Sequence, residues 1–147
     1  METLKGETVK SLDLKTLLIR VVDVLNYEGP LVSLFLNFKN YEIYLFDWSD
    51  KDKKANRWLI YRCQRATLNK LLEGEISYFD LMMSDEPFCY SVEIDSDQNW
   101  LNFLKIAKKD LPTKYIPSKD SFFDVVDCPD FNKLNVFVKS TPARSTR

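Results

Sequence analysis

The amino-acid sequence predicts an α+β domain: an antiparallel sheet of about five to six strands with a two-part helical insert packed on one face. Three runs dense in aromatic and aliphatic residues, 31–38, 41–48 and 57–63, are separated by short polar breaks. A segment with helical spacing follows, and two further alternating runs come after it. Strands and helices do not alternate along the chain, which disfavours a parallel α/β fold.

The length and composition indicate one globular domain. The chain has 147 residues, of which 45% are apolar and 29% charged, enough to form a core without the signature of disorder. We expect a flexible N-terminal arm over residues 1–11, a single α+β domain over 12–138 and a disordered C-terminal tail over 139–147.

The sequence favours a cytoplasmic protein that does not enter a membrane. It has no run of 18 apolar residues, and its N-terminus has no apolar core of a secretory signal. Cys63, Cys89 and Cys128 are odd in number, far apart and outside any CxxC pair, so we expect free buried thiols.

Residues 12–25 fit two alternatives. A helix would place apolar residues on one face through the spacing of Leu14, Leu17, Leu18, Val21, Val22 and Leu25. A strand is favoured by the β-branched residues Ile19, Val21, Val22 and Val24. Periodicity alone leaves both open.

The meander begins after a turn at Gly29-Pro30. Its predicted strands are Leu31–Phe38, Tyr41–Trp48 and Arg57–Cys63. The middle strand carries large side chains on both faces, so we expect both faces of the sheet to be partly covered.

The second half adds the helical insert and a hairpin. Thr67–Met83 has helical spacing with Thr67 as the expected N-cap and a break at Gly74. The strands Phe88–Asp95 and Trp100–Ala107 flank a polar turn. Beyond the proline-containing stretch 111–117, Asn135–Val138 is expected to form a last edge strand.

The order of several motifs resembles a family of small bacterial domains of unknown function, DUF6575. These motifs are NYEGPLVSLF, YLFDW, RWLIYRC, LNKLLEGEISYFDLM, FCYSVEID and LPTKYIP, and the match covers roughly residues 12–117. The resemblance implies that Leu14–Tyr27 is a strand and implies no catalytic residues.

The residue types argue against catalysis and cofactor binding. The chain has no histidine and only three glycines, which excludes Ser-His-Asp and Cys-His pairs, histidine-ligated metals and phosphate-cradling loops. Residues 95–99 begin like a calcium loop, but Trp100 and Ile106 replace the required glycine and glutamate. We therefore expect no catalytic, cofactor or metal residues.

A metal-dependent enzyme remains a second alternative, because acidic residues gather in two places. They are Glu42, Asp47, Asp50 and Asp52, and Glu93, Asp95 and Asp97. No lysine follows them in the spacing that metal-dependent nucleases use.

The charges are segregated although the net charge is −1. Residues 51–70 hold seven Lys or Arg and one acid, whereas 71–104 hold eight acids and no Lys or Arg. Aromatic residues lie among these cations, so the first alternative function is a nucleic-acid-binding module that uses the basic segment Lys51–Arg65. The alternative that we favour is that folding interleaves these charges in space.

The leading expectation is a non-enzymatic protein–protein interaction module of a bacterial cytoplasm. It would be an accessory, immunity or antitoxin-like partner of a larger effector, with phage defence as one setting. The candidate partner-binding residues are Tyr44, Phe46, Trp48, Lys53, Lys54, Arg57, Arg62, Glu73, Glu75, Asp85 and Glu86.

Overall fold

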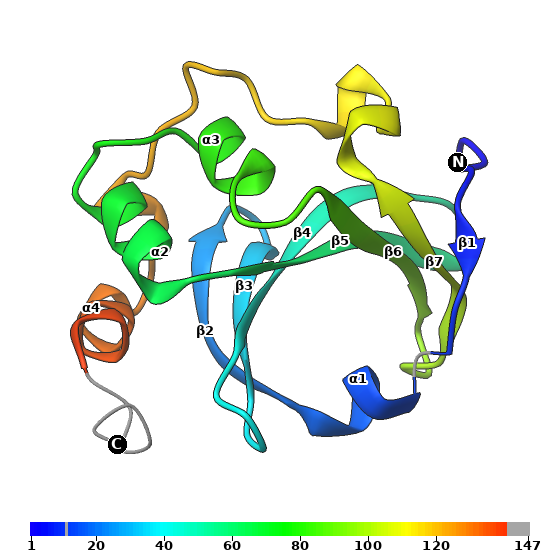
Figure 1. Ribbon diagram of the computed structural model, residues 1–147, viewed down its shortest axis with the longest axis horizontal. Coiled ribbons are helices and arrows are strands. Elements are labelled where there is room, and N and C mark those ends of the chain that lie inside the picture. Colours follow the sequence, from blue (N-terminus) through cyan, green and yellow to red (C-terminus); the bar gives the residue numbers. More distant parts are fainter. Residues whose placement is uncertain (11, 141–147) are drawn as a thin grey trace.

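A seven-stranded antiparallel sheet forms the centre of the computed structural model, which describes residues 1–10 and 12–140 (Figure 1). The strand order is β1-β7-β6-β5-β4-β3-β2. The strands are β1 (Glu7–Thr8), β2 (Leu18–Asn26), β3 (Pro30–Asn37), β4 (Ile43–Lys51), β5 (Ala55–Cys63), β6 (Phe88–Asp95) and β7 (Trp100–Ala107). The helices are α1 (Leu12–Leu17), α2 (Arg65–Leu72), α3 (Tyr78–Met83) and α4 (Phe131–Lys139), with 3₁₀ turns at Lys108–Asp110, Thr113–Tyr115 and Val125–Asp127.

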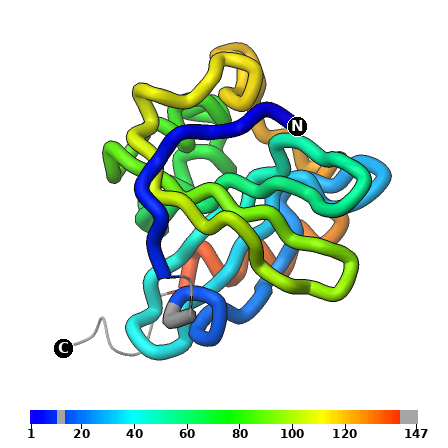
Figure 2. The backbone as a smooth tube through the Cα atoms, turned by 90° about the vertical axis from the view of Figure 1, so that its right-hand side faces the viewer, coloured from blue at the N-terminus to red at the C-terminus, as the bar shows by residue number. Residues whose placement is uncertain are grey.

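The sheet curls into an open arc with a convex and a concave face. Figure 1 shows α2, α3 and α4 outside the arc and α1 on its inner side, between the two edge strands. From β2 to β7 every strand pairs with its neighbour in sequence. The exception is β1, which runs beside β7 at the far edge, as Figure 2 shows for the N-terminal segment. The α+β class and the antiparallel sheet agree with the sequence, whereas the strand count exceeds the expected five to six.

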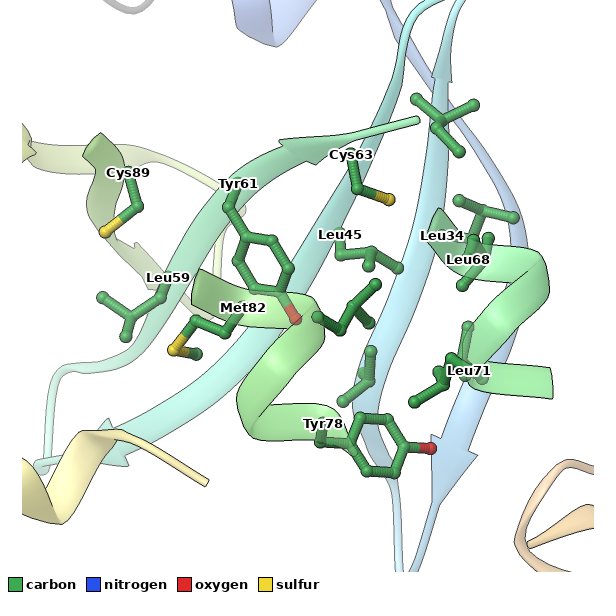
Figure 3. Close-up of a cluster of buried hydrophobic side chains, with 14 of the residues drawn as sticks. Leu34, Leu45, Leu59, Tyr61, Cys63, Leu68, Leu71, Tyr78, Met82 and Cys89 are labelled. Carbon is green, nitrogen blue, oxygen red and sulfur yellow. The ribbon is translucent and has the colours of Figure 1, made fainter. Parts of the chain in front are cut away.

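The main core lies between the convex face and the helices. Because side chains alternate along a strand, Leu34, Leu45 and Leu59 point to this face, where α2 and α3 cover them (Figure 3). Leu68 and Leu71 are fully buried against the strands. Burying one such leucine contributes roughly 1.5–3 kcal/mol, so this layer dominates the stability of the fold.

The helical insert is divided at Gly74, whose φ of +75° ends the first helix. The expected N-cap is wrong, because α2 begins at Arg65 and its N-cap residue is Gln64. The Thr67 hydroxyl instead donates to Asp85 Oδ1 at 3.2 Å. The other oxygen of the same carboxylate, Asp85 Oδ2, accepts from the Gln64 backbone N–H at 2.9 Å. The two helices are thus tied to the loop that leads into β6.

Both alternatives for residues 12–25 describe part of the segment. The leucine-rich first part forms α1, and the β-branched part forms β2, which pairs with β3. The strand that the DUF6575 resemblance implies for Leu14–Tyr27 is present only from Leu18.

The two ends of the chain differ most from expectation. The polar N-terminal residues contribute β1 and a buried Leu4, which packs in the main core. The edge strand expected at Asn135–Val138 is wrong, because α4 occupies these residues. Leu134 and Val138 are buried one helical turn apart while Val136 is 65% exposed, which is the burial pattern of a helix. Of the expected tail 139–147, residues 141–147 lie outside the described part.

Two further expectations concern helices and thiols. No helix within residues 1–10 and 12–140 is long and apolar enough to cross a membrane. Cys63, Cys89 and Cys128 are free and buried, as predicted.

Candidate binding pocket on the concave face

The concave face of the sheet is lined by aromatic side chains. The residues that alternation places there form a second buried cluster around Phe46, Ile60, Val92 and Phe103. The aromatic rings of this cluster contact one another, with centroid distances of 4.1 Å for Phe35–Phe46, 5.9 Å for Phe46–Trp100, 5.7 Å for Trp100–Phe103 and 5.1 Å for Tyr90–Phe103. The concave face therefore has a continuous apolar floor.

A cavity of about 620 Å³ opens over this floor at one end of the arc. In an antiparallel meander, the β2–β3, β4–β5 and β6–β7 turns all lie at the same end, and residues next to or within each turn line the cavity. We call this cavity the hairpin-end pocket. Its floor is formed by Leu18, Phe35, Phe46, Trp58, Ile94 and Trp100, and its rim carries Lys15, Arg20, Lys51, Lys53 and Lys54.

The rim is positively charged. Arg20 forms an ion pair with Asp23. The ammonium groups of the four rim lysines, Lys15, Lys51, Lys53 and Lys54, form no ion pair with any described residue. These four charges are thus available to a ligand.

Two carboxylates also line the pocket, and both are used within their own turns. Asp52 Oδ1 accepts from the backbone N–H groups of Lys54 at 2.8 Å and Ala55 at 3.0 Å. Asp95 Oδ1 accepts from the N–H groups of Asp97 and Asn99, both at 2.9 Å. These hydrogen bonds hold the pKa of each carboxyl below its ordinary value, so both are weak bases.

A smaller cavity of about 370 Å³ lies further along the same face. Leu14 and Leu17 of α1 line it, together with Tyr44, Tyr90 and Phe103. The opposite side of α1 contributes Lys15 to the hairpin-end pocket. The short helix α1 therefore separates two cavities that share one aromatic floor.

The structure brings three of the eleven sequence-predicted residues together at the hairpin-end pocket: Phe46 in its floor and Lys53 and Lys54 on its rim. Trp48 lies beside them, because its Nε1–H donates to Oδ1 of Asn56, which lines the pocket, at 3.0 Å. Tyr44 lines the smaller cavity instead.

Arg57 is separated from this group. It is 3% exposed and faces the opposite side of the sheet, where its Nη1–H donates to Tyr115 Oη at 3.1 Å and its Nη2 lies 3.6 Å from Glu93. Tyr115 in turn donates to Asp50 at 2.9 Å. Arg57 thus anchors the segment after β7 and is closed to a partner.

The remaining predicted residues lie near the helical insert. Arg62 is paired with Glu42 and Glu86, and Glu73 is paired with Lys139 of α4. Asp85 accepts hydrogen bonds at the start of α2, and Glu75 is exposed between α2 and α3. These acids do not join the hairpin-end pocket.

The basic segment Lys51–Arg65 is therefore divided among several places. Its lysines surround the pocket, Arg57 is buried on the other face and Arg62 is neutralised by two glutamates. Arg65 stacks on the Phe137 ring, 4.0 Å from its centroid. Only the first part of the segment presents free charge.

Sequence reasoning missed Lys15, Phe35 and Trp100 as pocket residues. Phe35 and Trp100 could have been found by following one face of each strand, since each alternates with polar or aliphatic neighbours. No sequence signal marks Lys15, because its position depends on the turn of the chain from α1 into β2.

The acidic residues considered for a metal do not converge. Within residues 1–10 and 12–140 no three His, Cys, Asp or Glu side chains are grouped to hold an ion. Glu93 pairs with Arg57 on the convex side, whereas Asp95 lines the concave pocket.

Comparison with models of known protein families found no match, and comparisons with curated proteins and with solved structures found none either. The resemblance to DUF6575 domains stays a prediction.

Proposed function

We propose that this chain is a non-enzymatic interaction module that binds a larger partner protein through the hairpin-end pocket. The observation that carries the proposal is the combination of an aromatic floor with four lysines that have no ion-pair partner among the described residues. A concave apolar site with a few charged groups at its edge is the usual form of a recognition pocket. An accessory, immunity or antitoxin-like role beside an effector, including one in phage defence, is the setting we propose for it.

The chemistry of the pocket supports binding over catalysis. Its two carboxylates are occupied by backbone N–H groups and have lowered pKa values, so neither is suited to accept a proton near neutral pH. The buried free thiols are consistent with a reducing compartment, and we propose the cytoplasm as the location.

Site-specific photo-crosslinking in the native host tests the proposal. A photoreactive amino acid replaces Lys53 at the pocket rim in one variant and the exposed Lys109 of the turn after β7 in the control. We expect one discrete protein adduct from position 53 and none from position 109. Equal adducts from both positions, or an adduct from position 109 alone, would contradict the proposed surface.

Single-stranded nucleic acid is the second candidate ligand. The observation in its favour is that Phe35, Trp58 and Trp100 lie in the same cavity as Lys51 and the other rim lysines. Binding of a labelled oligonucleotide should then weaken steeply as salt rises, because phosphate contacts release counterions. An adduct with RNA instead of protein in the crosslinking experiment would favour this candidate.

A further inference from the structure

We propose that the hairpin-end pocket binds an acidic segment of the partner that carries one large apolar side chain. The apolar side chain would lie on the aromatic floor, and the flanking carboxylates would meet the rim lysines. This inference rests on the proposed function and specifies the chemistry of the partner.

The floor suits an apolar anchor. Phe46 is 4% exposed, and its ring packs against Phe35, so the base of the pocket is a hydrophobic surface. Ile94 and Leu18 add aliphatic walls. A volume of about 620 Å³ accepts a large side chain together with neighbouring backbone.

The rim suits carboxylates. The rim carries five cations, whereas only two carboxylates, those of Asp52 and Asp95, line the pocket. Both carboxylates already accept hydrogen bonds from the backbone of their own turns. Lys53 and Lys54 are exposed on the β4–β5 turn, and Lys15 is exposed on α1. The positive charges therefore approach the mouth from two elements and would flank a segment that enters between them.

The charge distribution disfavours a nucleic-acid strand. A bound strand needs cations along its path, because every nucleotide adds a phosphate. Toward the other end of the concave face, Arg62 is already paired with Glu42 and Glu86. The smaller cavity there holds Glu7 as well as Lys10 and Lys105. The positive region is compact and fits a short acidic segment better than a long polyanion.

Short labelled peptides test this inference by fluorescence anisotropy with the full chain. The first peptide is acidic with one central phenylalanine, the second has alanine in place of the phenylalanine, and the third has glutamines in place of the acids. We expect the first peptide to bind and the other two to bind at least about tenfold more weakly, because each lacks one of the two interactions.

Charge reversal locates the site. We expect the double variant Lys53→Glu, Lys54→Glu to weaken binding of the first peptide by at least about tenfold. The matched control, Lys70→Glu with Lys109→Glu, reverses two exposed lysines outside the pocket and should change binding by less than about twofold. The variant Trp100→Ala should also weaken binding and Trp100→Phe should restore it, with circular dichroism showing that both fold.

Three results would overturn the inference: no binding of the first peptide at millimolar concentration, equal binding by the charge-reversed variant, or tighter binding of an oligothymidine that displaces the peptide. Failure of the proposed function can be distinguished from failure of this inference. If the protein adduct at position 53 persists in a Lys54→Glu, Lys51→Glu background, the interaction function stands and the acidic-segment inference fails. If neither adduct nor peptide binding occurs, both fail.

Discussion

Asp47 has the least favourable surroundings of any carboxyl group in the described chain. It lies on β4, between Val32 of β3 and Leu59 of β5, and no described residue gives its side chain a hydrogen bond or an ion pair. Desolvation raises the pKa of Asp47 to about 7. Burial raises the pKa of the Tyr78 hydroxyl, and the negative charge of Asp47 is the second cause of this rise. The Tyr78 hydroxyl has no hydrogen-bond partner among the described residues.

The raised pKa of Asp47 predicts a stability that falls as pH rises. The folded state holds the proton up to about pH 7, whereas the ordinary value is 3.8, so the stabilisation present below about pH 4 is lost as pH rises through 7. The variant Asp47→Asn should therefore be more stable than the wild type at pH 8, by about 1–4 kcal/mol, and similar to it near pH 4. Denaturant unfolding at several pH values measures this, with Asp97→Asn on an exposed turn as the control. An unchanged pH slope in Asp47→Asn would contradict the assignment.

Gly6 sets how closely the N-terminal strand approaches β7. A Cβ atom at this position would lie 2.7 Å from the backbone oxygen of Lys105 and 2.7 Å from Ile106 Cγ1. We expect Gly6→Ala to push β1 away from the sheet and to cost about 1–3 kcal/mol, as overpacking does. Hydrogen exchange of the Val9 N–H, which donates to the Phe103 carbonyl, should accelerate, whereas the exposed Thr3→Ala should leave it unchanged. Retained protection of Val9 would show that the strand tolerates the methyl group.

Among the elements, α3 depends strongly on its cap because it has only six residues. The Ser77 hydroxyl accepts from the Asp80 N–H at 3.2 Å, and Asp80 Oδ2 accepts from the Ser77 N–H at 3.1 Å. This reciprocal pair is a capping box. It fixes the helix that places Leu81 and Met82 in the main core.

Removing this cap should destabilise the protein measurably. We expect Ser77→Ala to lower the free energy of unfolding by about 0.5–2 kcal/mol. The control is Gln64→Ala at the start of α2, since the Gln64 side chain forms no capping hydrogen bond. Equal losses in the two variants, measured by denaturant unfolding, would argue against the capping contribution.

At the scale of the whole molecule, the two-sided sheet protects the thiols. Cys63 and Cys89 point into the convex core, and burial raises their pKa values to about 12 and about 11. Cys128 is also buried, and its Sγ lies 3.3 Å from the Asp23 carbonyl oxygen. All three are thus held as unreactive thiols.

We expect a thiol reagent to modify the cysteines of the native protein only as fast as the fold opens around them. All three cysteines should react rapidly in denaturant, which serves as the control for accessibility. A rapid phase of one thiol per chain in native buffer would show that one of them is exposed in solution.

The pocket is also a property of the whole molecule. Its rim and floor come from α1 and from the six strands β2 to β7, and no single element dominates. Curvature of the sheet and the common end of three hairpin turns bring these residues together. A change in sheet curvature would therefore alter the pocket without changing any of its residues.

Strands with strong alternation and clearly marked turns can be predicted from the sequence alone. The bounds of β6 and β7 agree with the expected Phe88–Asp95 and Trp100–Ala107, because short-range side-chain preferences and a polar turn fix them. The strand expected at Asn135–Val138 is wrong, because four residues of mixed polarity fit either period. Packing of Leu134 and Val138 against the core favours the helix.

Which charges and aromatic rings share a surface depends on the folded arrangement of the whole chain. Arg57 and Lys54 are three residues apart in sequence, yet one is buried behind the sheet and the other is exposed at the pocket. Lys15 and Trp100 are distant in sequence and line the same cavity. The physical reason is that strand alternation is local, whereas sheet curvature, the position of α1 and the pairing of charges result from long-range packing of the whole chain.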